Sequence, residues 1–349
     1  MSNPGIWPDE DKEWLGRCIL CGSKDRTLEH GDLEDKVTRA AAGRWSLHRC
    51  GNCALVYLDP RPHPAAIGRA YAGYYTHADA SSLPPWHWPG RRAAIRRAYL
   101  NARYGHALSG ALPFGQWLMR LRPRSSRRLD ITIRHLPPPS APDATLLDIG
   151  CGNGDFLDVA QELGYRASGM DADAGAVSAA TRRGHDVRIG LLPGSGFAPS
   201  SFDHVTLSHV LEHFHQPREA LVEIFGLLRP GGRLWITQPN PESDGHRRFG
   251  PNWRGLEPPR HMALYPAATL AKLLSDIGYA RVARLPTELA ARFYFRQSMA
   301  IAADVDPYRA EDPPGWEDGK RWADTADAAA LRNPERAESL TIVAYRPAN

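Results

Sequence analysis

The stretch Leu146–Leu157, with the sequence LLDIGCGNGDFL, places the strongest constraint on the fold of this chain. An apolar run ends at Ile149, and three glycines follow at alternate positions, Gly150, Gly152 and Gly154. Glycine allows a positive φ and has no Cβ to block a ligand that lies over a turn. The pattern therefore predicts a short buried strand, a tight turn and then a helix. Its D-x-G-x-G-x-G spacing differs from the G-x-G-x-x-G that places a pyrophosphate at a helix N-terminus.

Three later segments continue the pattern in a fixed order. Ala167–Asp171 is expected to form a second strand that ends in a carboxylate, which at this position suits a bidentate contact to ribose hydroxyls. Phe202–Leu207 leads into HVLEH at 209–213, and Leu228–Thr237 places a Pro-Gly-Gly turn before another strand. Over about residues 146–240, this ordered set resembles the class I S-adenosylmethionine (SAM)-dependent methyltransferases, in particular the branch that acts on small molecules. A nucleotide-binding domain of another chemistry is the alternative.

The resemblance implies an α/β fold with a Rossmann-like, doubly wound and mostly parallel sheet of seven strands, the last of them antiparallel. Alternating strand and helix patterns in the sequence agree with this fold. The expected strands are 145–149, 166–170, 186–189, 202–207, 233–237, 280–285 and 339–345. A helix is expected over 266–278, where leucines and an isoleucine recur at helical spacing.

The same resemblance implies SAM as the cofactor and assigns its pocket. Asp148 and the three glycines would shape the pocket, and Asp171 would hold the ribose. The other residues expected against the cofactor are Cys151, as a small packing residue, Ala172, Leu192 and His209. Many relatives carry an acid for the adenine amino group after the third strand, whereas this chain has GLLPG at 190–194. Apolar contact and backbone N–H groups are expected to hold the adenine instead.

Two histidines are the candidate catalytic residues. The sulfonium methyl of SAM is already activated, so the enzyme must align an acceptor and, for a hydroxyl or an amine, remove a proton. Histidine suits this role near neutral pH. His213 follows the fourth strand and is the first candidate for the base, and His261 lies in an insertion, 240–262, expected to fold over the same edge. Two alternatives stay open: the histidines are structural, or His209, Glu212 and His213 hold a divalent metal that orients a diol.

Four of the five cysteines form two pairs, Cys18-x2-Cys21 and Cys50-x2-Cys53. Two such knuckles complete a closed tetrahedral Zn²⁺ site, which is structural because four thiolates leave no open position. Gly22 and Gly51 are expected to supply the tight turns. The twenty-eight residues between the pairs exceed the usual spacing of about fifteen to twenty, so 23–49 should hold an extra strand or hairpin. Disulfides and redox chemistry are the weaker interpretations of these pairs.

The chain is expected to have three parts, which are a zinc-ribbon-like module at 1–62, a helical basic connector at 63–140, and a methyltransferase domain at 141–349 with insertions at 240–262 and 286–338. The zinc module and the aromatic stretch after it resemble a methyltransferase subgroup associated with surface-polysaccharide, sugar and natural-product pathways. The second insertion is expected to begin with an aromatic helix and to continue as a polar, proline-rich segment.

Helices are expected in the connector at 65–75 and 91–104. A third helix is indicated by four apolar side chains at i, i+3, i+4 and i+7, which we expect to face the core, namely Phe114, Trp117, Leu118 and Leu121. Residues 91–134 contain eleven arginines, no lysine and one acid, Asp130, for a net charge of +10. This surface is either a solvated helical cap or an anion-binding face for a pyrophosphate, an anionic membrane or RNA.

These patterns predict an enzyme, a SAM-dependent methyltransferase that methylates a hydroxyl of a small-molecule or lipid-linked acceptor such as a sugar, a surface-glycan precursor or a natural product. An RNA methyltransferase with a zinc module is the second hypothesis, although the core-like spacing of the connector aromatics argues against a stacking platform for bases. A non-catalytic SAM-binding scaffold is the third. No apolar run approaches the roughly eighteen residues of a membrane span, and the acidic N-terminus lacks a signal core, so a cytoplasmic location is expected.

Overall fold

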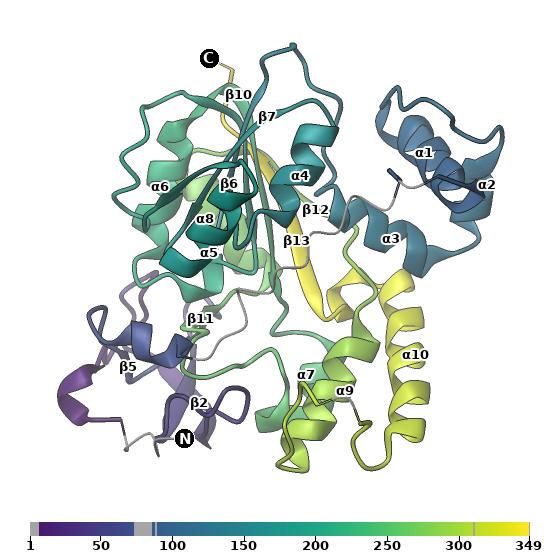
Figure 1. Ribbon diagram of the computed structural model, residues 1–349. Coiled ribbons are helices and arrows are strands. Elements are labelled where there is room, and N and C mark those ends of the chain that lie inside the picture. The colour runs from purple at the N-terminus through teal and green to yellow at the C-terminus, as the bar shows by residue number, and fades with distance from the viewer. Residues whose placement is uncertain (1–6, 73–85, 88, 310, 349) are drawn as a thin grey trace.

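The computed structural model describes residues 7–72, 86–87, 89–309 and 311–348. At its centre lies a seven-stranded sheet in the order β12-β13-β10-β9-β6-β7-β8 (Figure 1). Its strands are β6 (Thr145–Ile149), β7 (Arg166–Asp171), β8 (Asp186–Ile189), β9 (Phe202–Ser208), β10 (Leu228–Pro239), β12 (Ala280–Leu285) and β13 (Ser339–Tyr345). Strand β13 runs antiparallel to both of its neighbours, and the other described pairs in this sheet are parallel. This topology confirms the doubly wound, mostly parallel seven-stranded fold expected from the sequence.

Helices cover both faces of this sheet. They are α4 (Asp155–Glu162), α5 (Ala174–Arg182), α6 (Pro217–Leu227) and α8 (Ala267–Ile277). Successive residues of a strand point to opposite faces. In β6, Leu147 therefore packs in one core cluster with α6 and α8, whereas its neighbour Leu146 packs in a second cluster with α4. The carboxyl ends of the parallel strands meet at one edge of the sheet, which is where ligands bind in folds of this kind.

The N-terminal cysteines belong to a smaller four-stranded sheet in the order β11-β4-β3-β2 (Figure 1). Its strands are β2 (Arg26–Leu33), β3 (Trp45–Cys50), β4 (Val56–Leu58) and β11 (Ala263–Leu264). A second, two-stranded pair joins β1 (Lys12–Glu13), which follows η1 (Asp9–Asp11), to β5 (Arg61–Pro62). The β2–β3 hairpin is the extra structure expected between the two cysteine pairs. We call residues 7–62 the four-cysteine module, although β11 from beyond the first insertion completes its sheet.

The four-cysteine module is not an independent body. Leu55 and Tyr57 share one core cluster with residues of the central sheet, among them Leu147 and Ile236. The chain then continues through η2 (Ile67–Tyr71), a 3₁₀ helix within the stretch where the sequence predicts a helix over 65–75; positions 73–75 lie outside the described residues.

In the described part of the connector, three α-helices follow η2, namely α1 (Arg91–Tyr104), α2 (Gly115–Arg120) and α3 (Pro123–Thr132). Helices α1 and α2 stand away from the central sheet at the upper right of Figure 1. The expectation that the apolar side of the third predicted helix faces the core was wrong, because all four of its side chains are exposed. A Cβ on Gly115 would lie 3.0 Å from Ala98 Cβ and 3.1 Å from Ile95 Cα. Helix α2 therefore approaches α1 through its glycine side, and the apolar side points away.

The two insertions add helices beside the module and the sheet. The first holds α7 (Asp244–Phe249) and η4 (Gly250–Asn252), and the second holds α9 (Ala291–Ala302), α10 (Trp316–Arg332) and η5 (Pro334–Arg336). Helix α9 is the aromatic helix expected from the sequence. Helix α10 lies within the segment that the sequence marks as polar and proline-rich. It forms there because Ala323, Ala326 and Ala330 make a buried stripe at helical spacing. Among the described residues, no helix is both long and apolar enough to cross a bilayer.

Candidate active site

The glycine turn after β6 combines close packing with one open position. Gly150, Gly152 and Gly154 have φ values of +70°, +55° and +87°. A Cβ on Gly150 would lie 2.3 Å from a methyl of Val210, and one on Gly154 would lie 2.6 Å from the ring of His185. At Gly152, by contrast, no heavy atom lies within 4 Å of the Cβ position. The turn therefore leaves space over Gly152, where a ligand can approach the backbone.

Asp171 ends β7 directly beside this turn. Its Oδ2 accepts a hydrogen bond from the Gly152 N–H at 2.9 Å, and its Oδ1 accepts one from the Asp173 N–H at 2.9 Å. A carboxylate offers about four lone-pair directions, so these two bonds orient Asp171 and leave acceptor capacity for hydroxyl groups. The arrangement fits a cofactor that lays a ribose over the glycine turn.

Asp148 is fully buried, and its partner, Arg134, was not expected from the sequence. Its Oδ1 pairs with the Arg134 guanidinium and accepts a hydrogen bond from the Thr206 hydroxyl at 2.9 Å. Its Oδ2 has no hydrogen-bond partner among the described residues. Burial raises the pKa of Asp148, against the opposing pull of Arg134. The Arg134 guanidinium also lies 3.6 Å from the centre of the Phe156 ring. This arginine of the basic connector is therefore packed inside the fold beside Asp148 and is not a surface charge.

The remaining residues expected at the cofactor lie around the same turn. Cys151 is buried, burial raises the pKa of its thiol, and its Sγ lies 2.6 Å from where a Cβ of Gly169 would be, which fits a packing role. Ala172 follows Asp171 and is exposed. Leu192 is buried in the core, whereas the neighbouring Leu191 is exposed. Leu191 is therefore the apolar side chain of this loop that a ligand can reach.

His213 lies in η3 (Leu211–His213), just beyond the carboxyl end of β9. Its Nδ1 is 2.9 Å from the carbonyl oxygen of Arg260 and 2.9 Å from the Tyr71 hydroxyl. A carbonyl oxygen only accepts, so Nδ1 carries the hydrogen and donates it. In the neutral ring, Nε2 is then the unprotonated nitrogen and can accept a proton.

The structure brings His261 next to His213. The two rings meet edge to face with their centres 4.8 Å apart. His261 Nδ1 donates to the carbonyl oxygen of Gly255 at 2.8 Å, which fixes its tautomer in the same way. Burial lowers the pKa of His261 to about 4, despite the neighbouring Glu257 carboxylate. His261 therefore remains neutral near pH 7.

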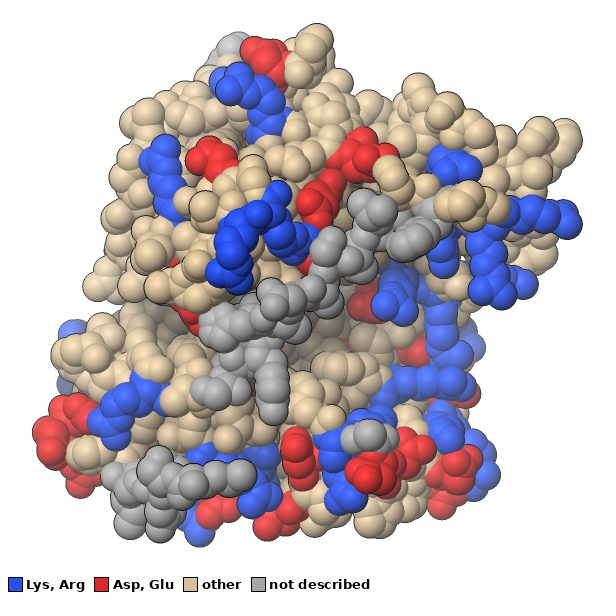
Figure 2. Space-filling view, viewed as in Figure 1, with Lys and Arg blue, Asp and Glu red and all other residues tan. Residues whose placement is uncertain are grey.

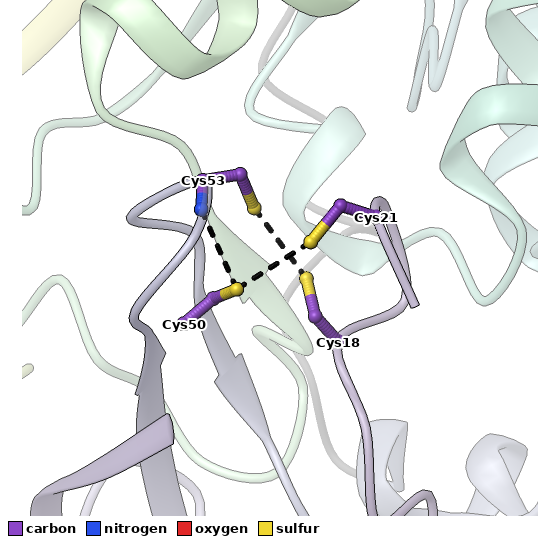
Figure 3. Close-up of side chains that lie close together, drawn as sticks. All are labelled: Cys18, Cys21, Cys50 and Cys53. Carbon is purple, nitrogen blue, oxygen red and sulfur yellow. Dashed lines mark hydrogen bonds between the residues drawn. The ribbon is translucent and has the colours of Figure 1, made fainter. Parts of the chain in front are cut away.

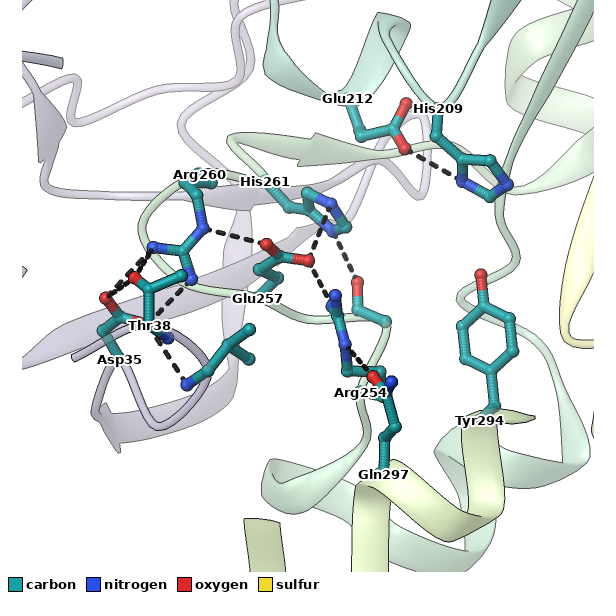
Figure 4. Close-up of polar contacts among 12 residues, drawn as sticks. Asp35, Thr38, His209, Glu212, Arg254, Glu257, Arg260, His261, Tyr294 and Gln297 are labelled. Carbon is teal, nitrogen blue, oxygen red and sulfur yellow. Dashed lines mark hydrogen bonds and ion pairs between the residues drawn. The ribbon is translucent and has the colours of Figure 1, made fainter. Parts of the chain in front are cut away.

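Glu212, His213 and His261 form one polar cluster. Each offers a ligand atom, and these three atoms lie within 4.8 Å of one another. Glu212 is fully buried, and its carboxylate forms no hydrogen bond among the described residues. Its Oε1 lies 3.4 Å from His209 Nδ1 (Figure 4). His209 has a φ of +56° and precedes η3, so it does not lie on one helix with His213.

A buried ionic network holds the segment that faces His213 (Figure 4). Arg260 is completely buried and donates to both carboxylate oxygens of Asp35, at 3.0 and 2.7 Å, and to Oε1 of Glu257 at 2.9 Å. Glu257 also pairs with Arg254, which in turn donates to Gln297 on α9. Burial opposes ionisation of Asp35, yet the Arg260 guanidinium holds the pKa of this carboxyl below its usual range. The carbonyl that orients His213 is thus anchored in the four-cysteine module.

The four cysteines form a compact centre in which their sulfurs point toward one another (Figure 3). The Sγ atoms of Cys18 and Cys53, and those of Cys21 and Cys50, lie 3.5 Å apart, and all four lie within 4.8 Å. A tetrahedral ZnS₄ site with bonds of about 2.3 Å requires sulfur separations of about 3.8 Å, so the donors fit this ion.

The turns of this centre differ in part from the expectation. Gly22 has the expected positive φ of +71°, but the matching position of the second knuckle is Ala54, with a φ of +60°. Gly51 serves a different purpose, because a Cβ there would lie 2.2 Å from the Asp25 carboxylate.

Comparisons with known proteins agree with this geometry. Residues 120–283 match the family described as "Methyltransferase domain". The chain is 29% identical over 114 residues to a demethylmenaquinone methyltransferase of Renibacterium salmoninarum, covering 32% of this chain and 46% of that protein. It is 34% identical over 100 residues to a mitochondrial ubiquinone biosynthesis O-methyltransferase of Schizosaccharomyces pombe, covering 26% and 36%. It is 30% identical over 136 residues to a Mycolicibacterium smegmatis protein named "Probable S-adenosylmethionine-dependent methyltransferase", covering 38% and 51%. The matches thus span about a third to a half of these relatives, and they support a SAM-dependent methyltransferase.

Proposed function

We propose that this chain is a SAM-dependent methyltransferase that methylates a hydroxyl group of a small-molecule or lipid-linked acceptor. One juxtaposition carries the proposal. The open glycine turn and Asp171 lie at the carboxyl ends of β6 and β7, and His213 lies beyond the end of β9, which is paired with β6. A cofactor site and a proton acceptor therefore share one edge of the sheet.

The residues have separate tasks in this proposal. The glycine turn, Asp148 and Asp171 hold SAM, which when bound supplies an activated methyl group. Nε2 of His213 takes the proton of the acceptor hydroxyl as its oxygen attacks, and the Arg260 carbonyl keeps the hydrogen of His213 on Nδ1. His261 remains neutral and packs against His213, so it orients the base and the acceptor without adding charge.

The relatives support the acceptor class. One of them is named as a demethylmenaquinone methyltransferase and another as a ubiquinone biosynthesis O-methyltransferase. A hydroxyl on a lipid-soluble ring is therefore one acceptor to test first, beside sugar and natural-product hydroxyls. In the same proposal, Cys18, Cys21, Cys50 and Cys53 bind a structural Zn²⁺ ion that takes no part in methyl transfer.

A second arrangement of the polar cluster is favoured by one observation, the Glu212 carboxylate that is buried without a hydrogen bond. Together with two neutral imidazoles, such a carboxylate suits a divalent cation that would bind a diol and acidify its hydroxyl. Turnover that requires added Mg²⁺ or Mn²⁺, with the cysteine-bound zinc retained, would favour this arrangement over a histidine base.

Binding of SAM tests the cofactor site. Asp171→Ala should weaken SAM binding about 10- to 150-fold for each charge-assisted hydrogen bond lost, as measured by titration calorimetry. Asp186→Ala is the matched control, because this carboxylate begins β8, bonds to the Ser168 hydroxyl and should leave the affinity unchanged. Equal SAM affinity in both variants and the wild type would overturn the assignment of Asp171. Single-turnover transfer from methyl-labelled SAM to lipid or aqueous extracts would then separate an enzyme from a SAM-binding scaffold.

A further inference from the structure

The connector exposes four large apolar side chains within eight residues. Their exposed fractions are 77% for Phe114, 55% for Trp117, 45% for Leu118 and 79% for Leu121. Single exposed apolar residues are ordinary on a protein surface, whereas a contiguous group of this size marks an interaction site. We call these four side chains the apolar face of α2.

The fold fixes this face outward. On the opposite side of α2, Met119 is buried in the cluster that joins the connector to α4, and Gly115 lies against Ala98 and Ile95 of α1. Any rotation that buried Trp117 and Leu118 would remove these contacts. The apolar face of α2 is therefore a stable feature of the folded chain.

Positive charge surrounds the apolar face. Arg91, Arg92, Arg120, Arg122 and Arg128 are exposed, and the Arg120 guanidinium lies 4.7 Å from the centre of the Trp117 ring. Lys and Arg side chains gather along the lower edge of these protruding helices in Figure 2.

The acid that lies among these arginines in the sequence does not offset the charge at the surface. Asp130 is buried and accepts hydrogen bonds from the hydroxyls of Tyr99 and Tyr104. Among the described ion pairs, Arg103 pairs with Asp130, Arg124 with Asp324 and Asp327, and Arg134 with Asp148. The surface around α2 remains strongly basic.

We infer that the apolar face of α2 and the arginines around it dock this protein on an anionic lipid bilayer. Phenylalanine, tryptophan and leucine side chains insert at the boundary between headgroups and acyl chains, and arginines beside them pair with lipid phosphates. The charge argues against a second copy of the chain as the occupant, since two such basic faces repel each other. Two of the four side chains are leucines, which cannot stack on bases, so the face suits an acyl layer better than a nucleic acid, which binds through stacked aromatics and phosphate contacts. This inference does not depend on methyl transfer, although a docked enzyme would reach a lipid-linked acceptor.

Vesicle binding by the full chain tests the inference. The protein should co-sediment with vesicles of phosphatidylcholine and phosphatidylglycerol at a 7:3 ratio, and at least about tenfold less with pure phosphatidylcholine. The double variant Trp117→Ser, Leu118→Ser should lower binding to the anionic vesicles at least about tenfold. Reversal of charge in Arg120→Glu, Arg122→Glu should lower it at least about 25-fold, because each arginine contributes about fivefold.

The chain offers a matched control for the apolar residues. Trp14, in the four-cysteine module, is 69% exposed, so Trp14→Ser removes an exposed tryptophan from a different surface and should leave vesicle binding unchanged. Melting temperature and SAM affinity of all variants establish that they fold. The inference would be overturned if the wild-type protein did not bind anionic vesicles at low salt, or if the double variant bound them as well as the wild type. Dimers that become monomers in the double variant, or RNA binding without vesicle binding, would overturn it in favour of another occupant.

Discussion

The four-cysteine module and the α1–α3 connector are both additions to the same sheet, yet they join it in opposite ways. The module is tied to the sheet by a shared core, by β11 and by the buried network of Asp35, Arg260 and Glu257. The connector shares a core with α4 through residues of α1, α2 and α3, but the apolar face of α2 stays exposed among arginines. The four-cysteine module therefore positions residues of the site, whereas the connector presents a surface to a partner outside the chain.

The difference also divides what changes in each region should do. A substitution inside the module should reach His213, because the Arg260 backbone carbonyl orients that ring. A substitution on the apolar face of α2 should leave the fold and the site intact.

Loss of the metal should have the largest effect. Cys50→Ser should abolish zinc binding and unfold the four-cysteine module, because the binding free energy of a structural zinc ion is folding free energy. Metal analysis should find one zinc ion per wild-type chain, none in Cys50→Ser, and one in Cys151→Ser, whose thiol lies in the glycine turn. Wild-type protein prepared without chelators that contains no zinc would refute the site.

Disruption of the buried network should come next. Arg260→Met leaves the buried Asp35 carboxylate without Arg260, and Glu257 keeps its pair with Arg254. Breaking a buried ion pair costs about 3–5 kcal/mol of unfolding free energy. Arg247→Met is the matched control, because Arg247 is exposed at 3.7 Å from Asp244 and such pairs contribute about 0–1 kcal/mol. Urea unfolding measures both. Equal stability of the two variants would show that the network does not anchor the module.

Acid should weaken both regions, each through a buried histidine. The pKa of His261, beside the module, is lowered to about 4, and that of His135, beside the connector, to about 3, mainly by burial. The unfolded chain takes up a proton at each site near pH 6.5, before the folded protein does. Their contribution to stability is therefore complete above pH 6.5 and is lost as the pH falls toward 4, by up to about 1.4 kcal/mol per pH unit for each residue.

One carboxyl works in the opposite direction. Burial raises the pKa of Glu338 to about 7, so its contribution to stability decreases as the pH rises from about 4.5 to 7. Urea unfolding at pH 7, 6 and 5 should still show a net loss toward acid, with a shallower slope in His135→Phe and in His261→Phe. A stability that rises as the pH falls would contradict this balance.

Local patterns predicted the regular elements of the sheet. Strands β6 and β8, as well as helix α1, have the bounds expected from the sequence, because glycine turns and apolar periodicity mark such ends within a few residues. The same local signals predicted the order of the strands along the chain. They also predicted that Asp171 ends the second of these strands and that His213 follows the fourth.

Contacts between distant segments were beyond such patterns. Helical spacing showed that α2 has one apolar side, but the direction of that side depends on the approach of Gly115 to α1. Arg134 was counted as one of many surface charges, although its φ of +49° turns it toward Asp148. The network of Asp35 and Arg260 joins residues 225 positions apart, and no local feature of either segment marks it.

A comparison of two alanine variants, His213→Ala and His261→Ala, tests whether His213 is the base. His213→Ala should lower kcat about 10²- to 10⁴-fold and leave SAM affinity nearly unchanged, because the base acts on the acceptor in the transition state. The wild-type rate should rise with pH, because only the unprotonated ring can take the proton of the acceptor, and the variant should lose that rise. His261→Ala should change the acceptor KM at least as much as kcat. Full kcat in His213→Ala, with the pH dependence retained, would contradict the assignment of His213 as the base.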